Sequence, residues 1–342
     1  MSNSINTKLK KVLVIGLGQL GLPVAKYVND KGFDVSGYDI STDAMIRAQE
    51  KIGLKTTTDF RNFDIYIICV STHNSSNITS PQIEGLISVI NKISTEANNG
   101  SLVSIESTIP KGTSKKIFEL LEHRLHVVHA PHRWYSLDEE KYGVNQLRVI
   151  GGVNPCCLKL GLEFYAGNSK CDTEKFTDED ILNNYNQLEN TNTTFIEVQQ
   201  NFNDSNSLSN NNQLESQAYF QSLEIPMHSV SSIEVAELTK IIENSHRYLQ
   251  IAFAEELYLY CQANNILFSE LRDALNTKWN VEILEPRDGI GGHCLPKDTK
   301  MFLSSKMRSK ILQSAMEVDT LYRDFLTRRE KKLITSVDNL TN

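Results

Sequence analysis

Short apolar segments that alternate with helical patterns fill the first 152 residues, and this alternation constrains the fold more than any other feature of the chain. Six such segments, rich in β-branched and aromatic residues, lie at 11–16, 33–39, 64–70, 101–107, 125–130 and 147–152. Strands that alternate with helices are typical of βαβ units with parallel strands. Their nearly continuous apolar character fits a sheet covered on both faces. The sequence therefore predicts an α/β protein with a Rossmann-type, doubly wound, mainly parallel sheet.

A change of composition after Gly167 interrupts this pattern. Residues 168–225 contain no Gly or Pro and are dominated by Asn, Ser, Gln and Glu. This little apolar surface cannot offset the entropy lost when the segment becomes ordered. We therefore predict a flexible insertion, and the alternative is a partner-binding segment. We accordingly expect an α/β domain at 1–167, the insertion at 168–225 and a further domain at 226–342.

Helical patterns dominate residues 226–342. The longest of them, 231–265, has apolar positions around much of its circumference, which favours a helix packed against several neighbours. Ser231 or Ser232 can cap its start. A Gly-rich loop follows at 286–298, and a last helical run closes the chain. We expect a mainly helical second domain built on the one long helix.

Charge and composition exclude several classes of function. The formal net charge of −7 argues against a nucleic-acid-binding surface. No apolar run approaches the roughly 20 residues that span a bilayer. The amino terminus has no signal-peptide pattern, so we expect a cytoplasmic protein. The six cysteines show no CxxC spacing, and we expect free thiols with neither disulfides nor a metal site.

A dinucleotide-binding pattern occupies the turn after the first predicted strand. Its spacing, G-x-G-x-x-G, is made by Gly16, Leu17, Gly18, Gln19, Leu20 and Gly21. Gly16 permits the tight turn, Gly18 lets the backbone approach a pyrophosphate, and Gly21 allows close packing of the helix on the strand. The N–H groups at the start of that helix attract the anion. The combination of strand, glycines and helix predicts a dinucleotide site.

Asp39, at the end of the second predicted strand, indicates which dinucleotide is bound. A carboxylate at this place accepts hydrogen bonds from ribose hydroxyls and repels a 2′-phosphate, so the sequence predicts NAD rather than NADP. The alternative is a glycine turn of some other α/β protein, in which Asp39 only caps a helix.

Reactive side chains gather in two segments of the second domain. Cys294 lies in the Gly-rich segment 289–298, where a thiol between glycines can approach a ligand and backbone N–H groups can stabilise a thiolate. Lys240, Asn244 and Arg247 are spaced i, i+4 and i+7 and so share one face of the long helix. A Lys–Asn pair on a mostly apolar helix either lines a site or faces solvent.

At this point the sequence resembles the UDP-glucose/GDP-mannose dehydrogenase family, most of all its members that oxidise UDP-N-acetylhexosamines. The resemblance rests on four motifs in the family's order: GLGQLGLPVA, ESTIPKGTS, VAELTKIIENSHRYLQIAFAEEL and GIGGHCLPKD. It covers nearly the whole chain outside the insertion. It implies oxidation of a sugar C6 alcohol to a carboxylate with reduction of two NAD, a place in polysaccharide biosynthesis, and a homodimer formed through helix 231–265.

The resemblance also implies roles for individual residues. Cys294 matches the nucleophile that traps the aldehyde as a thiohemiacetal and then becomes a thioester. Lys240 matches the lysine that stabilises oxyanion charge, and Asn244 matches its hydrogen-bonding companion. Asp298 matches the carboxylate that orders lysine and water, and Thr108 a hydroxyl beside cofactor and water. The expected cofactor residues are Gly16, Gly18, Gln19, Leu20, Gly21, Asp39, Val70, Ser71, Thr72 and Thr108.

Three departures from the family pattern qualify this expectation. Where the family has Pro-Glu, with a glutamate that activates water, this chain has Pro131-His132. His132 can act as a base near pH 7 or can be a structural histidine. The usual VPTP appears as Val70-Ser71-Thr72-His73, and no strands follow the catalytic loop to form the family's carboxyl-terminal UDP-binding domain.

Two other functions remain open alongside the nucleotide-sugar dehydrogenase. Two-domain β-hydroxyacid dehydrogenases also use a Lys–Asn helix pair, but they need no cysteine at the position of Cys294. A non-catalytic NAD-binding or regulatory paralogue would explain His132, but it would not need Cys294, Lys240, Asn244 and Asp298 together.

Overall fold

The structure is a computed structural model that describes residues 9–74, 76–77, 80–135, 137–167, 221–304 and 309–338, with side chains up to residue 331. The insertion predicted at 168–225 lies outside these residues except for its last five. Its flexibility and the three-part division of the chain therefore remain predictions.

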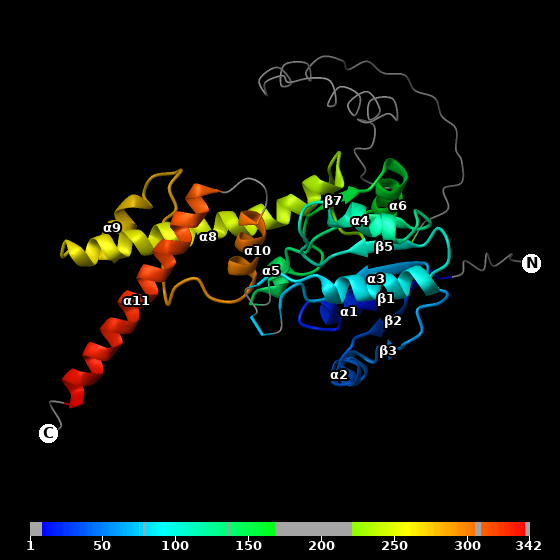
Figure 1. Cartoon of the computed structure of the whole chain (residues 1–342), viewed down its shortest axis with the longest axis horizontal. Coiled ribbons are helices and arrows are strands. Elements are labelled where there is room, and N and C mark those ends of the chain that lie inside the picture. Colours follow the sequence, from blue (N-terminus) through cyan, green and yellow to red (C-terminus); the bar gives the residue numbers. More distant parts are fainter. Residues whose placement is uncertain are drawn as a thin grey trace, which may run out of the picture.

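A mostly parallel sheet forms the core of the first part of the chain (Figure 1). In the residues that the structure describes, its eight strands lie in the order β3-β2-β1-β4-β5-β6-β7-β8. Their bounds are β1 Lys11–Ile15, β2 Asp34–Tyr38, β3 Lys55–Thr56, β4 Ile65–Ile68, β5 Leu102–Ile105, β6 His126–His129, β7 Arg148–Gly152 and β8 Met227–Ser229. All neighbours are parallel except β6 and β7. After β1 the chain forms β2 on one side of β1, and β4 later pairs with the other side of β1. The sheet order therefore reverses at β1, and doubly wound sheets bind nucleotides at such a switch point.

Helices cover both faces of this sheet. Their bounds are α1 Gly21–Asp30, α2 Thr42–Ile52, α3 Glu84–Glu96, α4 Thr113–Leu120, α5 Glu139–Tyr142 and α6 Pro155–Tyr165. Val12 and Val14 of β1 share one apolar cluster with buried side chains of α1, α2 and α6. Leu13 and Ile15 point to the other face and share a cluster with α3 and α4. Side chains alternate across a strand, so the continuous apolar strands serve two cores, and the predicted doubly wound fold is confirmed.

The second part of the chain is helical and is organised around α8 (Ile233–Ala263). At 31 residues this helix is about 46 Å long. It runs from the sheet near β7 to α9 (Phe268–Leu275), and α10 (Cys294–Leu303) and α11 (Lys310–Asp338) pack along it (Figure 1). Ser232 occupies its N-cap position without a side-chain cap hydrogen bond. None of the helices in the described part of the chain is both long and apolar enough to cross a membrane.

The Gly-rich segment ends earlier than the sequence pattern indicates. We predicted a loop over 286–298, but α10 begins at Cys294. Pro296 sits in the first turn of that helix, where the missing N–H costs nothing because the first N–H groups of a helix have no partner within it. The cysteine therefore lies at a helix amino terminus rather than within a loop.

Candidate active site

The glycine turn after β1 is shaped by two close backbone approaches. Gly16 has a φ of +92°, and a Cβ on it would lie 2.7 Å from the carbonyl oxygen of Cys69. A Cβ on Gly21 would lie 1.6 Å from the carbonyl oxygen of Gly16. Neither position tolerates a side chain, whereas a Cβ on Gly18 would meet nothing within 4 Å. The first and third glycines thus form the turn, and the second leaves its backbone open.

The start of α1 has room for an anion. Gly18 and Gln19 are exposed, and Leu20 at the N-cap position makes no side-chain cap hydrogen bond. The first turn of α1 carries no acidic residue. The first N–H groups of a helix attract negative charge when no side chain occupies them. These features fit the pyrophosphate of a dinucleotide.

Asp39 ties the glycine turn to the end of β2. One carboxylate oxygen accepts a hydrogen bond from the Leu17 N–H at 2.7 Å, and the other accepts from the Ser41 N–H at 2.8 Å. The side chain is half-buried. Each carboxylate oxygen can accept a second hydrogen bond, so the anchoring role is compatible with binding of ribose hydroxyls.

The other predicted cofactor residues follow the carboxyl ends of neighbouring strands. Val70, Ser71 and Thr72 come after β4, and Thr108 comes after β5, whose end is in register with that of β4. The Ser107 hydroxyl donates to the Val70 carbonyl oxygen at 2.7 Å and so joins the two loops. The residues predicted to bind cofactor therefore gather at one edge of the sheet.

The helix that carries Cys294 is bonded directly to this edge. The Lys297 ammonium, buried in the first turns of α10, donates to the Thr72 hydroxyl at 3.1 Å. The rings of His73 and His293 lie beside each other, with centroids 4.9 Å apart. The contacts bring residues more than 200 positions apart together, and they place the start of α10 at the cofactor edge.

Lys240 and Asn244 of α8 face Asp298 of α10. The Asn244 side-chain amide donates to one Asp298 oxygen, and the Lys297 ammonium lies 2.8 Å from the other. Burial lowers the pKa of Lys240, and the negative charge of Asp298 opposes this shift. The two helices therefore hold a lysine, an amide and a carboxylate in one cluster. Arg247, which shares their helix face, is exposed, and its guanidinium donates to the Gln250 side-chain oxygen.

Cys294 is exposed at the amino end of α10, next to this cluster. Burial of the sulfur and the Asp298 charge raise the pKa of the thiol above its ordinary value, while Lys297 and Lys240 lower it. A Cβ on Gly291 or Gly292 would meet nothing within 4 Å, so the loop just before the cysteine has open space beside it. A ligand can reach the exposed side chain, and the lysine charges only partly offset the rise in the pKa of the thiol.

His132 lies inside the α/β domain, in a network that sequence reasoning missed. Its Nε2 hydrogen-bonds to Glu106, which also accepts from Arg148 and from the Tyr165 hydroxyl. Burial lowers the pKa of His132 to about 4, so the ring is neutral near pH 7. The sequence left two roles open for His132, a catalytic base and a structural histidine. In the structure its hydrogen-bond partner is Glu106. In the sequence, Glu106 belongs to the ESTIP motif and Arg148 is a single charged residue in an apolar strand. Neither observation indicates that the two residues form a pair.

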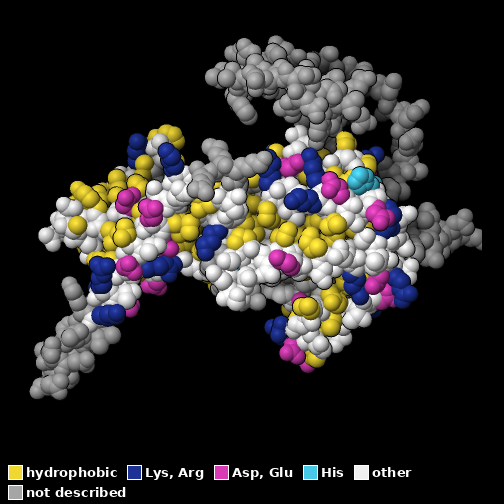
Figure 2. Space-filling view, viewed as in Figure 1, with side chains coloured by type: hydrophobic (Ala, Val, Ile, Leu, Met, Phe, Trp, Pro, Cys, Tyr) yellow, Lys and Arg dark blue, Asp and Glu magenta, His cyan; other side chains and the backbone are white. Residues whose placement is uncertain are grey.

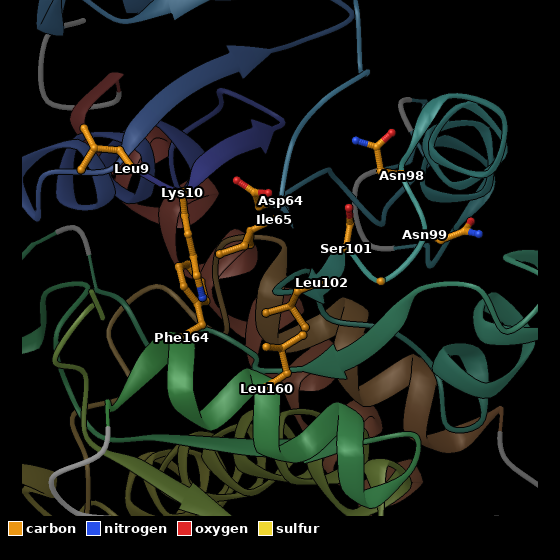
Figure 3. Close-up of a pocket in the computed structure, with 11 residues that line it drawn as sticks. Leu9, Lys10, Asp64, Ile65, Asn98, Asn99, Ser101, Leu102, Leu160 and Phe164 are labelled. Atoms are coloured by element: carbon orange, nitrogen blue, oxygen red, sulfur yellow. The ribbon is translucent and has the colours of Figure 1, made fainter. Parts of the chain in front are cut away.

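A cavity of about 320 Å³ lies elsewhere, at the amino ends of the strands (Figure 3). Lys10, Asp64 and Leu102 line it together with Leu160 and Phe164 of α6. None of the predicted site residues lines it, because the predicted cofactor residues follow the carboxyl ends of the strands and the predicted catalytic residues of the second domain lie on α8 and α10. The cavity is therefore separate from the candidate active site.

Two family models match the chain. The NAD binding domain of the UDP-glucose/GDP-mannose dehydrogenase family matches residues 10–168, and the central domain of the same family matches residues 234–320. Together they cover most of the chain, and the first match supports NAD as the cofactor, as the sequence predicted.

Curated relatives agree with this match, and a solved structure shares the fold. UDP-N-acetyl-D-mannosamine dehydrogenase of Methanococcus vannielii is 26% identical over 334 residues, which cover 91% of this chain and 65% of the relative. The chain thus spans about two thirds of that relative's length. The structure of UDP-D-ManNAc dehydrogenase from Pyrococcus horikoshii gives a TM-score of 0.69 at 24% identity and covers 96% of this chain and 72% of its own.

A third similarity concerns the fold alone. Mycobacterium tuberculosis 3-hydroxyisobutyrate dehydrogenase gives a TM-score of 0.58 at 11% identity, with 94% of each chain covered. The fold of this chain is therefore also shared with a dehydrogenase of similar length.

Proposed function

Because the chain belongs to the UDP-glucose/GDP-mannose dehydrogenase family, we propose that it oxidises the C6 alcohol of a UDP-sugar to the uronate. The UDP-N-acetylhexosamines are the preferred substrate class, since the relatives above are named for one of them. One observation carries the proposal: Cys294, Lys240, Asn244 and Asp298 form a cluster that Lys297 bonds to the cofactor loop. A reaction of this kind is expected in the cytoplasm.

The first oxidation needs a base and a group that stabilises negative charge on oxygen. NAD, when bound, accepts the hydride from C6. Lys240 has a lowered pKa, so its ammonium gives up a proton more easily than a solvated lysine and can mediate loss of the hydroxyl proton. Asn244 is held by Asp298 and can donate to the developing oxyanion. The product of this step is the C6 aldehyde.

The second oxidation uses Cys294. Its sulfur adds to the aldehyde carbon and the carbonyl oxygen takes up a proton, which gives a thiohemiacetal. Loss of a second hydride and of the hydroxyl proton leaves a thioester. Water then cleaves the carbon–sulfur bond, which releases the carboxylate and restores the thiol. The overall change is an alcohol and one water to a carboxylate, with two NAD reduced.

We assign activation of the water to Asp298, and to Thr108, which follows β5, the role of the hydroxyl beside the water that the family resemblance implies. Asp298 is 1% exposed and is paired with Lys297, so it stays in place while the substrate changes. His132 is the other candidate that the sequence indicates. Its Nε2 is occupied by Glu106, and only Nδ1 has no hydrogen-bond partner among the described residues. A base at His132 would therefore have to act through Nδ1.

Counting NADH per sugar tests the proposal. With limiting UDP-N-acetylmannosamine, the intact enzyme is expected to release two NADH per sugar. Cys294→Ser is expected to slow steady-state NADH formation by at least about 100-fold, because the second oxidation loses its nucleophile. His123→Asn changes an exposed side chain on another part of the molecule and is the control.

A second candidate is a two-electron dehydrogenase of the β-hydroxyacid type. The shared fold with 3-hydroxyisobutyrate dehydrogenase over 94% of both chains favours it. Such an enzyme needs Lys240 and Asn244 but not Cys294, so unchanged NADH formation by Cys294→Ser with a small hydroxyacid would establish it instead. NAD binding without turnover of either substrate class would indicate a non-catalytic paralogue.

A further inference from the structure

Three metal-ligating side chains meet at the edge of the sheet opposite the glycine turn. His126 begins β6, and its partner in the neighbouring strand is Leu102, the first residue of β5. Cys156 and Cys157 lie in the first turn of α6, which follows β7. Because β7 runs antiparallel to β6, the end of β7 returns the chain to the start of β6. The pairing brings together residues that are about 30 positions apart.

The ligand atoms have the spacing of a metal site. Nδ1 of His126 lies 3.7 Å from the Cys156 sulfur and 3.6 Å from the Cys157 sulfur. All three atoms lie within 4.8 Å of one another. A tetrahedral ion with Zn–S bonds of about 2.3 Å and Zn–N bonds of about 2.0 Å separates sulfur from nitrogen by roughly 3.5 Å. The two sulfur–nitrogen distances therefore match two edges of such a tetrahedron.

We propose that His126, Cys156 and Cys157 bind one Zn²⁺ ion. Two thiolates and an imidazole are the donors that Zn²⁺ takes in proteins, whereas Mg²⁺ and Ca²⁺ require oxygen donors. The site supplies three protein ligands, so a water or a further ligand completes the coordination from the exposed side of Cys156. The site does not depend on the proposed dehydrogenase reaction.

Hydrogen bonds at the start of α6 hold the two sulfurs in place. The Cys157 sulfur accepts a hydrogen bond from the Val127 N–H at 3.4 Å. Asn154, the N-cap of α6, accepts from the Cys157 N–H at 2.9 Å and fixes the turn that carries both sulfurs. The first turn of α6 has no acidic residue, and a helix amino terminus favours negative charge.

Binding of the ion would join two elements and release protons. A thiol that ligates a divalent ion gives up its proton, so metal binding at the two cysteines releases protons. The ion would tie the start of β6 to the start of α6. We expect a more stable α/β domain rather than a change at the cofactor edge, which lies at the other ends of the strands.

Cobalt and zinc binding to the Cys294→Ser chain tests the site, since this background removes the exposed catalytic thiol. Co²⁺ is expected to produce thiolate-to-cobalt charge-transfer absorption at one ion per chain, and Zn²⁺ is expected to displace it. Adding His126→Asn or Cys156→Ser should weaken binding by more than the roughly 10–100-fold that loss of an outer-shell partner costs. His123→Asn, at an exposed histidine outside the cluster, should leave the affinity unchanged.

Loss of the metal site is distinguished from loss of the fold in each variant. NAD binding and the melting temperature without metal show whether the variant is folded. Equal affinity in the His126→Asn, Cys156→Ser and His123→Asn variants would refute the site. So would a thiol titration in which the adjacent cysteines are found oxidised and no ion binds. A melting temperature that rises with Zn²⁺ in the His123→Asn chain but not in the His126→Asn chain would support it.

Discussion

Glu106 and Arg148 form a buried ion pair in the NAD-binding domain, each with about 1% of its side chain exposed. Burial alone would raise the pKa of Glu106, but the Arg148 guanidinium and the hydrogen bonds from His132 and Tyr165 lower it. The Tyr165 hydroxyl also meets the Ser104 hydroxyl at 2.6 Å. Each charge in this network thus depends on its partner, because neither has access to water.

Removal of the Glu106 charge is expected to destabilise the protein strongly. Glu106→Gln leaves the buried guanidinium without a counter-charge, which costs about 3–5 kcal/mol. Urea unfolding followed by circular dichroism measures the loss. Glu119→Gln changes an exposed carboxylate on α4 and should shift the free energy of unfolding by no more than about 0.5 kcal/mol. Equal stability of the two variants would show that Arg148 is solvated.

At the scale of elements, the turn between β1 and α1 separates glycines that shape the backbone from a glycine that faces the ligand. Gly21→Ala places a methyl group 1.6 Å from the Gly16 carbonyl oxygen, so the helix must move. Overpacking of this kind costs about 1–3 kcal/mol. We expect a lower melting temperature together with weaker NAD binding.

Gly18→Ala is the matched variant at the same turn. Its methyl group meets no protein atom within 4 Å, so the melting temperature should change little. NAD affinity, measured by calorimetry, should fall because the methyl group lies where the pyrophosphate is expected. Full NAD affinity of Gly18→Ala would contradict the proposed place of the cofactor.

The contact between α8 and α11 contains two buried carboxyl groups, Glu255 and Asp319. Burial and the nearby Asp319 charge raise the pKa of Glu255 to about 8 from its ordinary value of 4.5. A carboxyl whose folded-state pKa is raised stabilises the protein below its unfolded pKa and loses that contribution as the pH rises to the folded value. Stability should therefore decrease between about pH 4.5 and 8.

Glu255→Gln should remove this dependence. The amide cannot ionise, so the variant is expected to be more stable than the parent at about pH 8.5, by on the order of 2 kcal/mol, and similar to it at about pH 5. Urea unfolding at the two pH values gives both numbers. Glu256→Gln, at the exposed next residue of α8, should show the parent's pH dependence. Parallel stability curves for Glu255→Gln and the parent would contradict the raised pKa.

At the scale of the molecule, α8 presents an exposed apolar stripe. Val235, Ile242, Phe253 and Tyr260 are 44–57% exposed, and their spacings of 7, 11 and 7 residues place them on one side of the helix. Figure 2 shows apolar side chains gathered where α8 and α9 lie. An apolar stripe of this length on a helix is typical of an interface. We therefore propose that a second copy of the chain packs against α8.

Substitution within the stripe tests the homodimer. Phe253→Glu should convert a dimer into monomers, because it places a charge in the middle of the apolar contact. Ile40→Glu changes a side chain that is 93% exposed on the NAD-binding domain and should leave the dimer intact. Analytical ultracentrifugation distinguishes the states. A parent chain that sediments as a monomer would exclude the interface.

Much of this protein is encoded locally in its sequence. Apolar runs, glycine spacing and helical periodicity depend on residues within a few positions of one another, and they predicted the doubly wound sheet, the NAD turn and the long helix. The family resemblance depends on the same short segments. The two family-model matches confirm it. The predicted loop over 286–298 was wrong at its end, because Pro296 is compatible with a first helical turn.

Only the tertiary structure decided which distant residues meet. Lys297 bonds to Thr72 across 225 positions, Arg148 pairs with Glu106, and His126 lies between two cysteines of another element. Strand order and helix packing set these pairs, and no periodicity in the sequence records them. His132 is the clearest case, because its residue type allows a base or a buried partner. The burial that lowers its pKa exists only in the folded chain.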